Sequence, residues 1–543
     1  MCSEVLFLII SAFVFAASFP GFLFYEGFSL LAFIALIPMF TVIHNTKWSL
    51  TPVYGFLYGM VFYLLFNYWL KSFHPLAIII VPIIKGGELL VLFLVLKFVD
   101  TFFKKRRYLL MAVVYTAYTY LSQNWFAGYP YGTLGYAAYN LLPFIQMASI
   151  TGVWGINFIM VLPQIFIGIY LGEYLKDNSY GFKKYLKEYR MDVIVFAISF
   201  VLIIVLGLLS MNKWNNKEPQ KEWRVATIQH SADTWKGGFL TYKRNFNNLR
   251  MYSLEALTQD PDIVLWSETA FVPSVAWHEN YPSDEDTTAL VEEFVNFGKE
   301  LSVPLVTGNP EGVIKDPSLP ALLADGKWNR DDYNSVIFFE DGEIKNTYRK
   351  QHLVPFTEYF PYEKQLPWLY KILKDNDYHW WLQGKESVVF TTDEDVRFST
   401  PICFEDVFGE ISAGFVKNGA SVLLNMTNDG WANSKASEMQ HAAIAVFRSV
   451  ENRKSTMRST NSGITCLIDP NGKIIDPMIP FKAGWKIYTV PVYDSEVEGF
   501  TFYTEHPNLF GIISAYISYV SIGLMVIYQI VVYLKKKKNK SGE

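Results

Sequence analysis

A succession of long apolar segments between Val5 and Leu209, with one more near the C-terminus, constrains this chain more than any other feature. Each segment is close to the roughly 20 residues that an α-helix needs to cross a hydrocarbon core of about 30 Å. We expect eight membrane-spanning helices, at about 5–21, 27–44, 52–71, 76–99, 108–123, 150–173, 192–211 and 508–534. The sequence thus predicts three parts: a seven-helix transmembrane domain at 1–211, an extramembrane domain at 212–507, and a C-terminal transmembrane helix with a basic tail at 508–543.

Clusters of lysine and arginine predict how the chain is oriented in the membrane. They follow the fourth, sixth and eighth predicted spans, at Lys104–Arg107, Lys183–Arg190 and Lys535–Lys538. Because cytoplasmic segments are enriched in lysine and arginine, we expect all three clusters on the cytoplasmic side. Both termini are then cytoplasmic, and 212–507 lies on the opposite face, which is the periplasm for a bacterial inner membrane.

The composition supports a membrane protein and excludes several other classes. Of the 543 residues, 51% are hydrophobic and 17% aromatic, more than is usual in a soluble protein. The net charge of −4 and the absence of a broad basic segment or nucleic-acid motif argue against a nucleic-acid partner. The three cysteines show neither CxxC nor metal-type spacing, so we expect no disulfide scaffold and no metal site.

The stretch Asn124–Tyr139 is rich in glycine and aromatic residues and too interrupted for a span. Aromatic rings favour the membrane interface. We expect a loop at the outer membrane surface, either beneath the extramembrane domain or as an aromatic belt that only anchors the protein.

From Trp223 onward, short apolar strands alternate with helix-length patterns, which is typical of a layered α/β domain. The helices are expected near 238–258, 284–301, 406–418 and 435–453. Asp341-Gly342 and Asn471-Gly472 predict hairpin turns, since glycine tolerates the backbone conformation of such turns. The strands are expected at 224–230, 262–268, 303–309, 333–340, 343–349, 388–391, 397–402, 421–427, 463–469 and 486–492.

Three of the predicted strands end at residues that could together catalyse acyl transfer. Glu268 ends one, Lys350 follows another, and Cys403 follows a third and precedes a pair of acidic residues. A carboxylate can act as general base, a lysine can stabilise an oxyanion, and a thiol can act as nucleophile. By contrast Cys466 lies within an apolar strand without charged neighbours, which predicts a core residue.

Two histidines compete with Glu268 for the role of base. His352 lies two residues after Lys350, and His441 lies in the last predicted helix of the domain. The sequence leaves a Cys/His pairing open. A helix expected from Val407 to Val416 would direct its first N–H groups toward Cys403, which favours a thiolate.

The order Glu, Lys, Cys and the sequences around these residues resemble the nitrilase superfamily and, within it, the apolipoprotein N-acyltransferase family. The matching segments are Trp-Ser-Glu268-Thr, Tyr-Arg-Lys350-Gln-His-Leu-Val-Pro-Phe-Thr-Glu358-Tyr and Ile-Cys403-Phe-Glu405-Asp. The resemblance extends over the whole chain, and includes the Gly-Tyr-Pro-Tyr loop and the segments Thr427–Trp431, Gln440–His441 and Arg458–Gly463.

The resemblance implies an αββα sandwich with Glu268 as base, Lys350 as oxyanion stabiliser and Cys403 as nucleophile. It implies that Glu358 supports the lysine and that Glu405 follows the nucleophile in a supporting role. The backbone N–H of Phe404 would serve the oxyanion, and Trp235 would border the opening for lipid. The chain departs from the family at Thr357, usually glycine, and at Phe404, usually tyrosine.

The implied reaction moves an acyl chain from the sn-1 ester of a phospholipid, expected to be phosphatidylethanolamine, to Cys403 as a thioester. The α-amino group of a lipoprotein's diacylglyceryl-cysteine then takes the chain as an amide. No cofactor is required, because the ester already carries the activation. Two alternatives stay open: a membrane-tethered amidase on the same scaffold, and a docking module for lipoproteins without activity.

Overall fold

The computed structural model describes residues 2–73, 75–125, 128–282, 284–375 and 380–540. By its internal contacts the chain separates into two compact units. Unit 1 comprises Met1–Asn212 and His506–Glu543, and unit 2 comprises Lys213–Glu505. Each unit is described by itself below.

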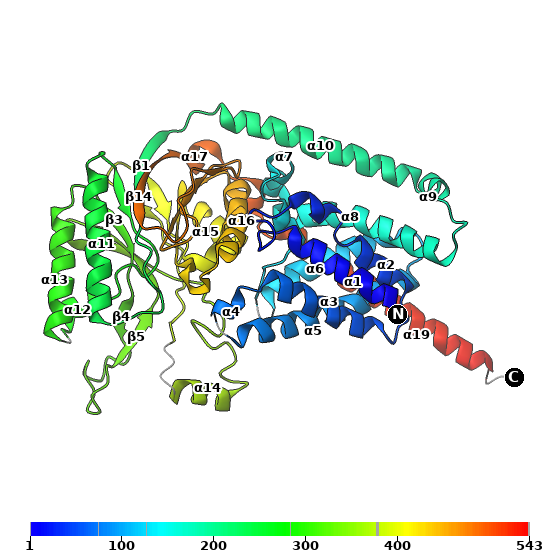
Figure 1. Cartoon of the computed structure of the whole chain (residues 1–543), viewed down its shortest axis with the longest axis horizontal. Coiled ribbons are helices and arrows are strands. Elements are labelled where there is room, and N and C mark those ends of the chain that lie inside the picture. Colours follow the sequence, from blue (N-terminus) through cyan, green and yellow to red (C-terminus); the bar gives the residue numbers. More distant parts are fainter. Residues whose placement is uncertain (1, 74, 126–127, 283, 376–379, 541–543) are drawn as a thin grey trace. The chain divides into compact units, whose positions relative to one another are not determined.

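Unit 1 is helical (Figure 1). Four of its helices, α5, α8, α10 and α19, are long and apolar enough to cross a membrane. The 3-10 helices η1 (Ser29–Phe33) and η2 (Leu134–Ala138) lie between its α-helices. The α-helices are α1 (Cys2–Ala17), α2 (Ile37–Asn45), α3 (Thr51–Phe66), α4 (Leu70–Phe73), α5 (Ala77–Phe102), α6 (Arg107–Asn124), α7 (Leu142–Ile145), α8 (Ala148–Lys176), α9 (Phe182–Glu188), α10 (Arg190–Asn215) and α19 (Leu509–Lys540).

The prediction of eight spans therefore differs from the structure, which has four such helices among the described residues. The first predicted span stops at Ala17, before Pro20 and Gly21. The second divides into η1 and α2, and α3 is only 16 residues long. Helix α6 carries many tyrosine, threonine and serine side chains, which lower its apolar character.

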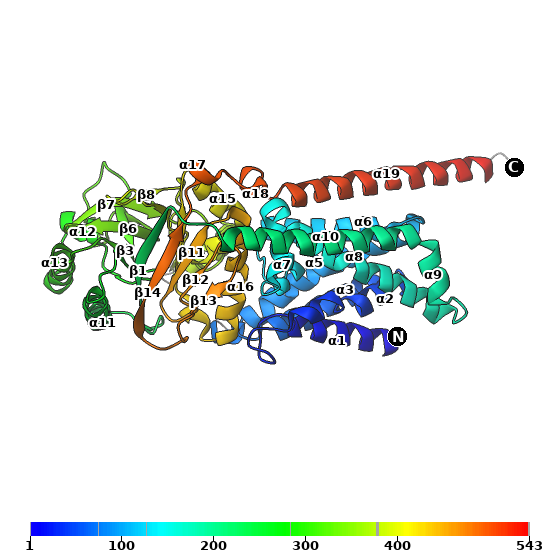
Figure 2. The ribbon, with the colours of Figure 1, turned by 90° about the horizontal axis from the view of Figure 1, so that it is seen from above.

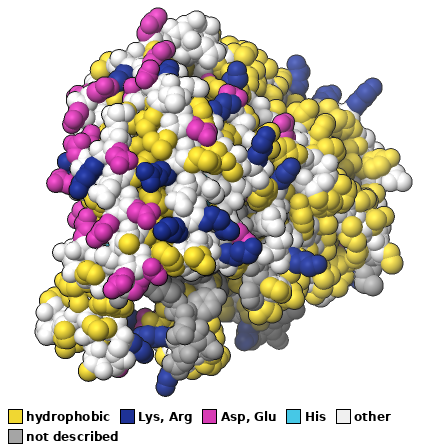
Figure 3. Space-filling model, turned by 60° about the vertical axis from the view of Figure 1, so that its left-hand side comes forward, with side chains coloured by type: hydrophobic (Ala, Val, Ile, Leu, Met, Phe, Trp, Pro, Cys, Tyr) yellow, Lys and Arg dark blue, Asp and Glu magenta, His cyan; other side chains and the backbone are white. Residues whose placement is uncertain are grey.

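The long helices of unit 1 expose apolar side chains that water would not tolerate in such number. Val195, Ile198, Val201 and Leu202 of α10 are each more than half exposed. Figure 3 shows a face on which hydrophobic side chains gather over one part and charged side chains of both signs are intermixed over another. The apolar surface of these helices fits contact with lipid.

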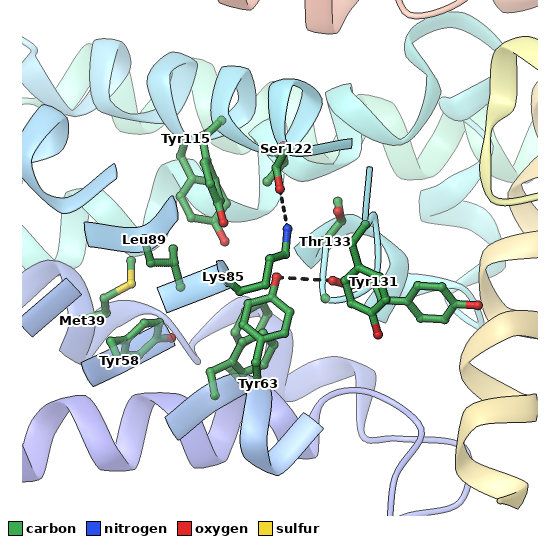
Figure 4. Close-up of a pocket in the computed structure, with 15 residues that line it drawn as sticks. Met39, Tyr58, Tyr63, Lys85, Leu89, Tyr115, Ser122, Tyr131 and Thr133 are labelled. Carbon is green, nitrogen blue, oxygen red and sulfur yellow. Dashed lines mark hydrogen bonds between the residues drawn. The ribbon is translucent and has the colours of Figure 1, made fainter. Parts of the chain in front are cut away.

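The later part of the aromatic stretch is packed inside unit 1, whereas Trp125 near its start is 66% exposed. The expected position of the stretch at the outer membrane surface stays a prediction. Tyr131, Tyr136 and Tyr139 are all less than one-tenth exposed. Two residues of the stretch, 126 and 127, lie outside the described residues. Figure 4 shows Tyr63 of α3 donating to the backbone carbonyl of Tyr131 (3.3 Å) beside the buried Lys85 of α5.

The ammonium group of Lys85 has hydrogen-bond partners within the helices of unit 1. Its Nζ donates to Oγ of Ser122, as Figure 4 shows, and to Oε2 of Glu88 (2.8 Å). A charge buried among apolar helices is costly unless it is paired, and here the carboxylate neutralises the ammonium group. This polar group lies against the aromatic stretch and holds α5 and α6 together.

Unit 2 contains two six-stranded sheets and a two-stranded ribbon. The first sheet has the order β14-β1-β2-β3-β6-β7 and the second β13-β12-β11-β10-β9-β8. The ribbon pairs β4 (Glu311–Ile314) with β5 (Arg330–Tyr333). The strands of the sheets are β1 (Lys221–Gln229), β2 (Ile263–Leu265), β3 (Leu305–Gly308), β6 (Ser335–Glu340), β7 (Glu343–Arg349), β8 (Phe390–Thr391), β9 (Arg397–Ser399), β10 (Val422–Thr427), β11 (Ser455–Thr460), β12 (Cys466–Ile468), β13 (Ile474–Ile475) and β14 (Gly484–Val492).

The helices of unit 2 cover the outer faces of the two sheets, as Figure 2 shows. Helices α11 and α13 pack on the first sheet, and α15 and α16 pack on the second. The helices are α11 (Phe239–Leu257), α12 (Val275–Asn280), α13 (Glu285–Glu300), α14 (Pro367–Asp375), α15 (Gly409–Lys417), α16 (Lys435–Asn452), α17 (Ser495–Glu498) and α18 (Phe502–Glu505), with 3-10 helices η3 (Cys403–Val407) and η4 (Asp429–Ala432).

Side chains that point alternately to the two faces of each strand form the core of the sandwich. On β1, Val225 faces the second sheet in a buried cluster with Phe398 and Leu424, while its neighbour Ala226 faces the helices with Phe246. Successive side chains of a strand point to opposite faces, so one strand supplies both clusters. Unit 2 is therefore the predicted αββα sandwich.

Candidate active site

The side chains of Glu268 and Lys350 meet, although they follow two different strands of the first sheet. Glu268 comes three residues after β2, and Lys350 directly follows β7. Both side chains are buried, with 5% and 1% of the residue exposed. Thr269, which follows the glutamate, has a φ of 50°, a conformation that is strained for a β-branched residue and is found mainly where function requires it.

A second glutamate and an asparagine complete the surroundings of the lysine. Lys350 Nζ donates to Oε1 of Glu358 (2.9 Å) and to Oε1 of Glu268 (3.3 Å). Asn334 Nδ2 donates to the same two oxygens, at 3.1 and 2.8 Å. The backbone N–H of Asn428 donates to the other oxygen of Glu268 (2.9 Å). Glu268 is therefore held at both oxygens, which fixes its direction.

Lys350 carries its positive charge at neutral pH. Burial alone would lower the pKa of Lys350, but the negative charges of Glu358 and Glu268 outweigh burial and raise the pKa. A buried lysine between two carboxylates stays protonated, because losing the proton would leave two like charges close together. It is a fixed positive charge in a site of low polarity, which is what an oxyanion requires.

Cys403 lies beyond β9 of the second sheet, at the first residue of η3. Its φ of 47° places it in the left-handed region, which is uncommon for residues other than glycine. Its thiol is close enough to Glu268 and Lys350 for both charges to act on its pKa. The structure thus brings the three predicted residues together from two sheets.

The thiol is protonated at rest. Burial and the negative charge of Glu268 raise the pKa of Cys403 well above its ordinary value, and Lys350 only partly opposes them. The expected helix begins at Gly409 as α15, two residues later than predicted, and the 3-10 helix η3 begins at Cys403 itself. Cys403 therefore needs a base that takes its proton during attack, rather than a thiolate formed in advance.

Glu405 connects the turn of the cysteine to the turn of the lysine. Its carboxylate accepts from the backbone N–H groups of Ile402 (2.7 Å), Gln351 (2.6 Å) and His352 (3.0 Å). The hydroxyl of Tyr348 donates to it as well, at 2.8 Å. Burial raises the pKa of Glu405 to about 7, although these donors oppose the shift. Glu405 therefore fixes the position of the turn of Lys350 relative to the turn of Cys403.

Neither histidine can replace Glu268 as base in this arrangement. Both ring nitrogens of His441 face carboxylate oxygens, of Asp406 (2.6 Å) and Asp429 (2.7 Å), and are thus occupied. The ring of His352 packs on Phe408, with 3.8 Å between centroids. Burial and the charge of Lys350 lower the pKa of His352 to about 4, so it is a poor proton acceptor.

The remaining predicted residues lie around this cluster or on the surface. Phe404 is buried and meets Phe408 edge-on. Trp235 is 57% exposed and packs edge-on against Trp431 of η4, with 5.1 Å between centroids. Thr357 is exposed in a turn in which the preceding Phe356 has the positive φ of 63°. The turn therefore does not need glycine at position 357.

Two functional neighbours are absent from the sequence prediction. Asn334 bridges both glutamates, and its backbone carbonyl also accepts from the N–H of Lys350 (2.9 Å). Tyr348 donates to Glu405. The available signal was a polar residue immediately before β6 and a tyrosine in β7 two residues before Lys350. Among the described residues, no group of three His, Cys, Asp or Glu side chains could hold a metal ion.

Comparison with known proteins assigns both units to families. Residues 11–165 match the family described as "Apolipoprotein N-acyltransferase N-terminal domain". Residues 224–493 match the family described as "Carbon-nitrogen hydrolase". Among solved structures, an amidase of the nitrilase superfamily from Nesterenkonia AN1 is 17% identical, with a TM-score of 0.35 over 50% of this chain and 93% of that one.

Two proteins from Treponema species are similar over nearly the whole length. "Apolipoprotein N-acyltransferase 1" of Treponema denticola is 36% identical over 96% of this chain and 96% of its own. The protein of the same name from Treponema pallidum is 33% identical over 93% of each chain. The chain therefore belongs to the apolipoprotein N-acyltransferase family and is an enzyme of the acyltransferase class.

Proposed function

We propose that this chain moves an acyl chain from a phospholipid to the α-amino group of the diacylglyceryl-cysteine of a lipoprotein, through a thioester on Cys403. The observation that carries the proposal is the buried group of Glu268, Lys350 and Glu358 beside a cysteine at a strained strand end. Family membership across both units supports an acyl acceptor of this kind over the water of an amidase.

In the first step, Sγ of Cys403 attacks the carbonyl carbon of the sn-1 ester while Glu268 takes the thiol proton. Lys350 and the backbone N–H of Phe404 stabilise the oxyanion. The bond from the carbonyl carbon to the glycerol oxygen then breaks, and Glu268 returns the proton to that oxygen. A lysophospholipid leaves, and the acyl chain remains on sulfur.

In the second step, the amine of the lipoprotein attacks the thioester. Glu268 takes a proton from the nitrogen as the C–N bond forms, and the C–S bond breaks. The sulfur recovers a proton, which restores the resting thiol. The raised pKa of Cys403 favours this end state, because the protein holds the neutral form more readily than the thiolate.

The supporting residues act on the geometry of these steps. Glu358 keeps the charge of Lys350 in place, and Glu405 joins the turn of Lys350 to the turn of Cys403. Trp235, paired with Trp431, borders the opening for lipid. Phosphatidylethanolamine is the proposed donor.

We place the catalytic domain, 212–507, on the periplasmic face of a bacterial inner membrane with both termini in the cytoplasm. The proposal keeps eight crossings, seven in 1–211 and one in 508–543. It is supported by the lysine and arginine residues between α5 and α6, on α9 and at the end of α19. Both substrates carry acyl chains, so an active site anchored at the membrane can reach them.

Mass spectra of the N-terminal peptide of a lipoprotein test the proposal. Cells with this protein should yield the peptide with a third acyl chain, and cells without it should yield two. A third chain in both, or in neither, would contradict it. Turnover of a small soluble amide by the purified protein, without lysophospholipid release, would favour the amidase instead.

A further inference from the structure

A second group of charges lies next to the site and has no part in the steps above. It consists of Asp406, Asp429, His441 and Arg458, called here the four-residue charge cluster. His441 bonds to Asp406 through Nε2 and to Asp429 through Nδ1. Arg458 bonds to the other oxygen of Asp406 and, at 3.0 Å, to the other oxygen of Asp429. Two cations and two anions thus form a closed ring.

The ring joins the two turns that carry the chemistry. Asp406 lies in η3 with Cys403, and Asp429 begins η4, directly after Asn428. The N–H of Asn428 holds one oxygen of Glu268. His441 on α16 and Arg458 on β11 connect these turns through the two aspartates. Both are buried, with 3% of His441 and 0% of Arg458 exposed. Movement of either aspartate would therefore shift the nucleophile relative to its base.

The two carboxylate contacts favour a charged His441. Each ring nitrogen faces a carboxylate oxygen, and the imidazolium is the state that can donate to both. Nδ1 also lies 3.4 Å from Nη2 of Arg458, a longer contact than the 2.7 Å to Asp429. Burial alone would lower the pKa of His441, but Asp406 and Asp429 raise it to about 9 against the opposing charge of Arg458. Glu438, one turn earlier on α16, is fully buried, and burial raises its pKa to about 9.

We propose that protonated His441 is a positioning residue that holds Cys403 against Glu268 through the two aspartates. The inference rests on the proposed function and goes beyond it, because it assigns a role to a residue that touches neither substrate nor the reacting sulfur. Arg458 shares the same carboxylates and keeps the ring neutral in total charge.

The direct test replaces His441 by glutamine in the full-length protein, with H278Q as the matched control. His278 is a buried histidine of α12 whose Nδ1 faces the carbonyl oxygen of Ser274. Glutamine is neutral, and both of its donors lie on one nitrogen, so it cannot link the two aspartates from opposite edges as the imidazolium does. We expect H441Q to form the acyl-enzyme roughly 10- to 100-fold more slowly, because misplacement of reacting groups is costly. Equal rates for H441Q and H278Q would overturn the proposal.

The pH dependence separates positioning by charge from a structural role. The initial rate of lysophospholipid release by the wild type should fall as pH rises through about 9, where His441 loses its proton. Lys350 does not contribute to this decline, since its pKa is raised above the ordinary lysine value. E438Q should keep the decline and H441Q should lose it. The proposal would be contradicted if the decline disappeared in E438Q. It would also be contradicted if the wild-type rate did not change between pH 7 and pH 10.

The outcomes also separate this inference from the proposed function. If the wild type forms no thioester on Cys403, the proposed function fails. If the wild type forms it and H441Q matches H278Q, only the role of His441 fails. If the thermal transition shows that H441Q does not fold, the pH profiles of lysophospholipid release by the wild type and E438Q still test the role of His441.

Discussion

Cys466 lies in the second sheet of unit 2 and Cys403 lies just beyond a strand of the same sheet, but the two thiols meet different groups. Cys466 is the first residue of β12, fully buried and paired in register with Arg458 of β11. Cys403 lies beyond the end of β9, partly exposed, in a left-handed conformation and next to Glu268 and Lys350. The first sulfur fills space in a sheet, and the second faces charges that converge from another sheet.

The comparison shows that a low pKa is not what distinguishes the reactive cysteine here. Burial raises the pKa of Cys466 to about 12, and the pKa of Cys403 is also raised. What differs is that Cys403 meets a base, Glu268, together with the cation Lys350, whereas the charge that acts on Cys466 is that of Arg458. Reactivity therefore depends on which groups a sulfur meets and not only on its resting charge.

The largest effect should come from removing the sulfur itself. C403A should form no acyl-enzyme and release no lysophospholipid, because no nucleophile remains. Radiolabelled phospholipid and gel analysis of the intact protein measure this directly. The comparison would fail if C403A still acquired a hydroxylamine-sensitive label.

Removing the base should have the next largest effect. E268Q keeps the shape of the side chain but cannot accept the thiol proton, so acylation should slow by about 10²- to 10⁴-fold. Single-turnover kinetics of lysophospholipid release give the rate constant. E343Q, at an exposed position of β7, is a suitable control. A rate for E268Q equal to that of this control would remove Glu268 from the mechanism.

A smaller effect is expected from Glu405, the carboxylate behind Cys403. Its pKa in the folded protein, about 7, lies above the ordinary 4.5, so the folded state holds this proton more tightly than the unfolded chain. That stabilisation is complete below about pH 4.5 and is lost as pH rises through about 7.

E405Q has no proton to lose at this position. The thermal midpoint of the wild type relative to E405Q should therefore fall between pH 4.5 and 7.5. Thermal unfolding of both proteins in the same detergent at several pH values measures the difference. A difference that stays constant with pH would mean that Glu405 does not titrate in this range.

The smallest effect should follow from C466A. Loss of a small buried side chain in a well-packed sheet costs about 1–2 kcal/mol in the free energy of unfolding. Because Cys466 is not next to Glu268 or Lys350, acyl transfer should continue at close to the wild-type rate. Loss of acyl-enzyme in C466A, with the fold intact by its thermal transition, would contradict the distinction between the two cysteines.

Much of unit 2 could be predicted from the sequence because its local patterns agree with its tertiary structure. The turn at Asp341-Gly342 joins β6 to β7 as predicted, and Asn471-Gly472 joins β12 to β13. Strand β11 (Ser455–Thr460) was not predicted, since Ser-Thr-Met-Arg-Ser-Thr lacks an apolar alternation. It is buried because neighbouring strands and side chains satisfy its polar groups, which a local pattern does not reveal.

The candidate site was predictable where a residue type marks its own chemistry, as for Glu268, Lys350 and Cys403. Asn334 was not, because its importance comes from contacts with Glu268 and Glu358, 66 and 24 residues away. The short or divided helices of unit 1 could not be predicted for a similar reason, and four described helices are long and apolar enough to cross a membrane. Buried polar pairs such as Lys85 and Glu88 let shorter and more polar helices pack together than apolar length alone suggests.

Peptide mass spectrometry of the full-length protein after brief incubation with phospholipid tests the central claim most directly. The account predicts one acyl chain, removable by hydroxylamine, on the peptide that contains Cys403, and none on the peptides of Cys2 and Cys466. An acyl chain on either of those cysteines instead, or transfer to a lipoprotein with Cys403 unmodified throughout, would contradict it.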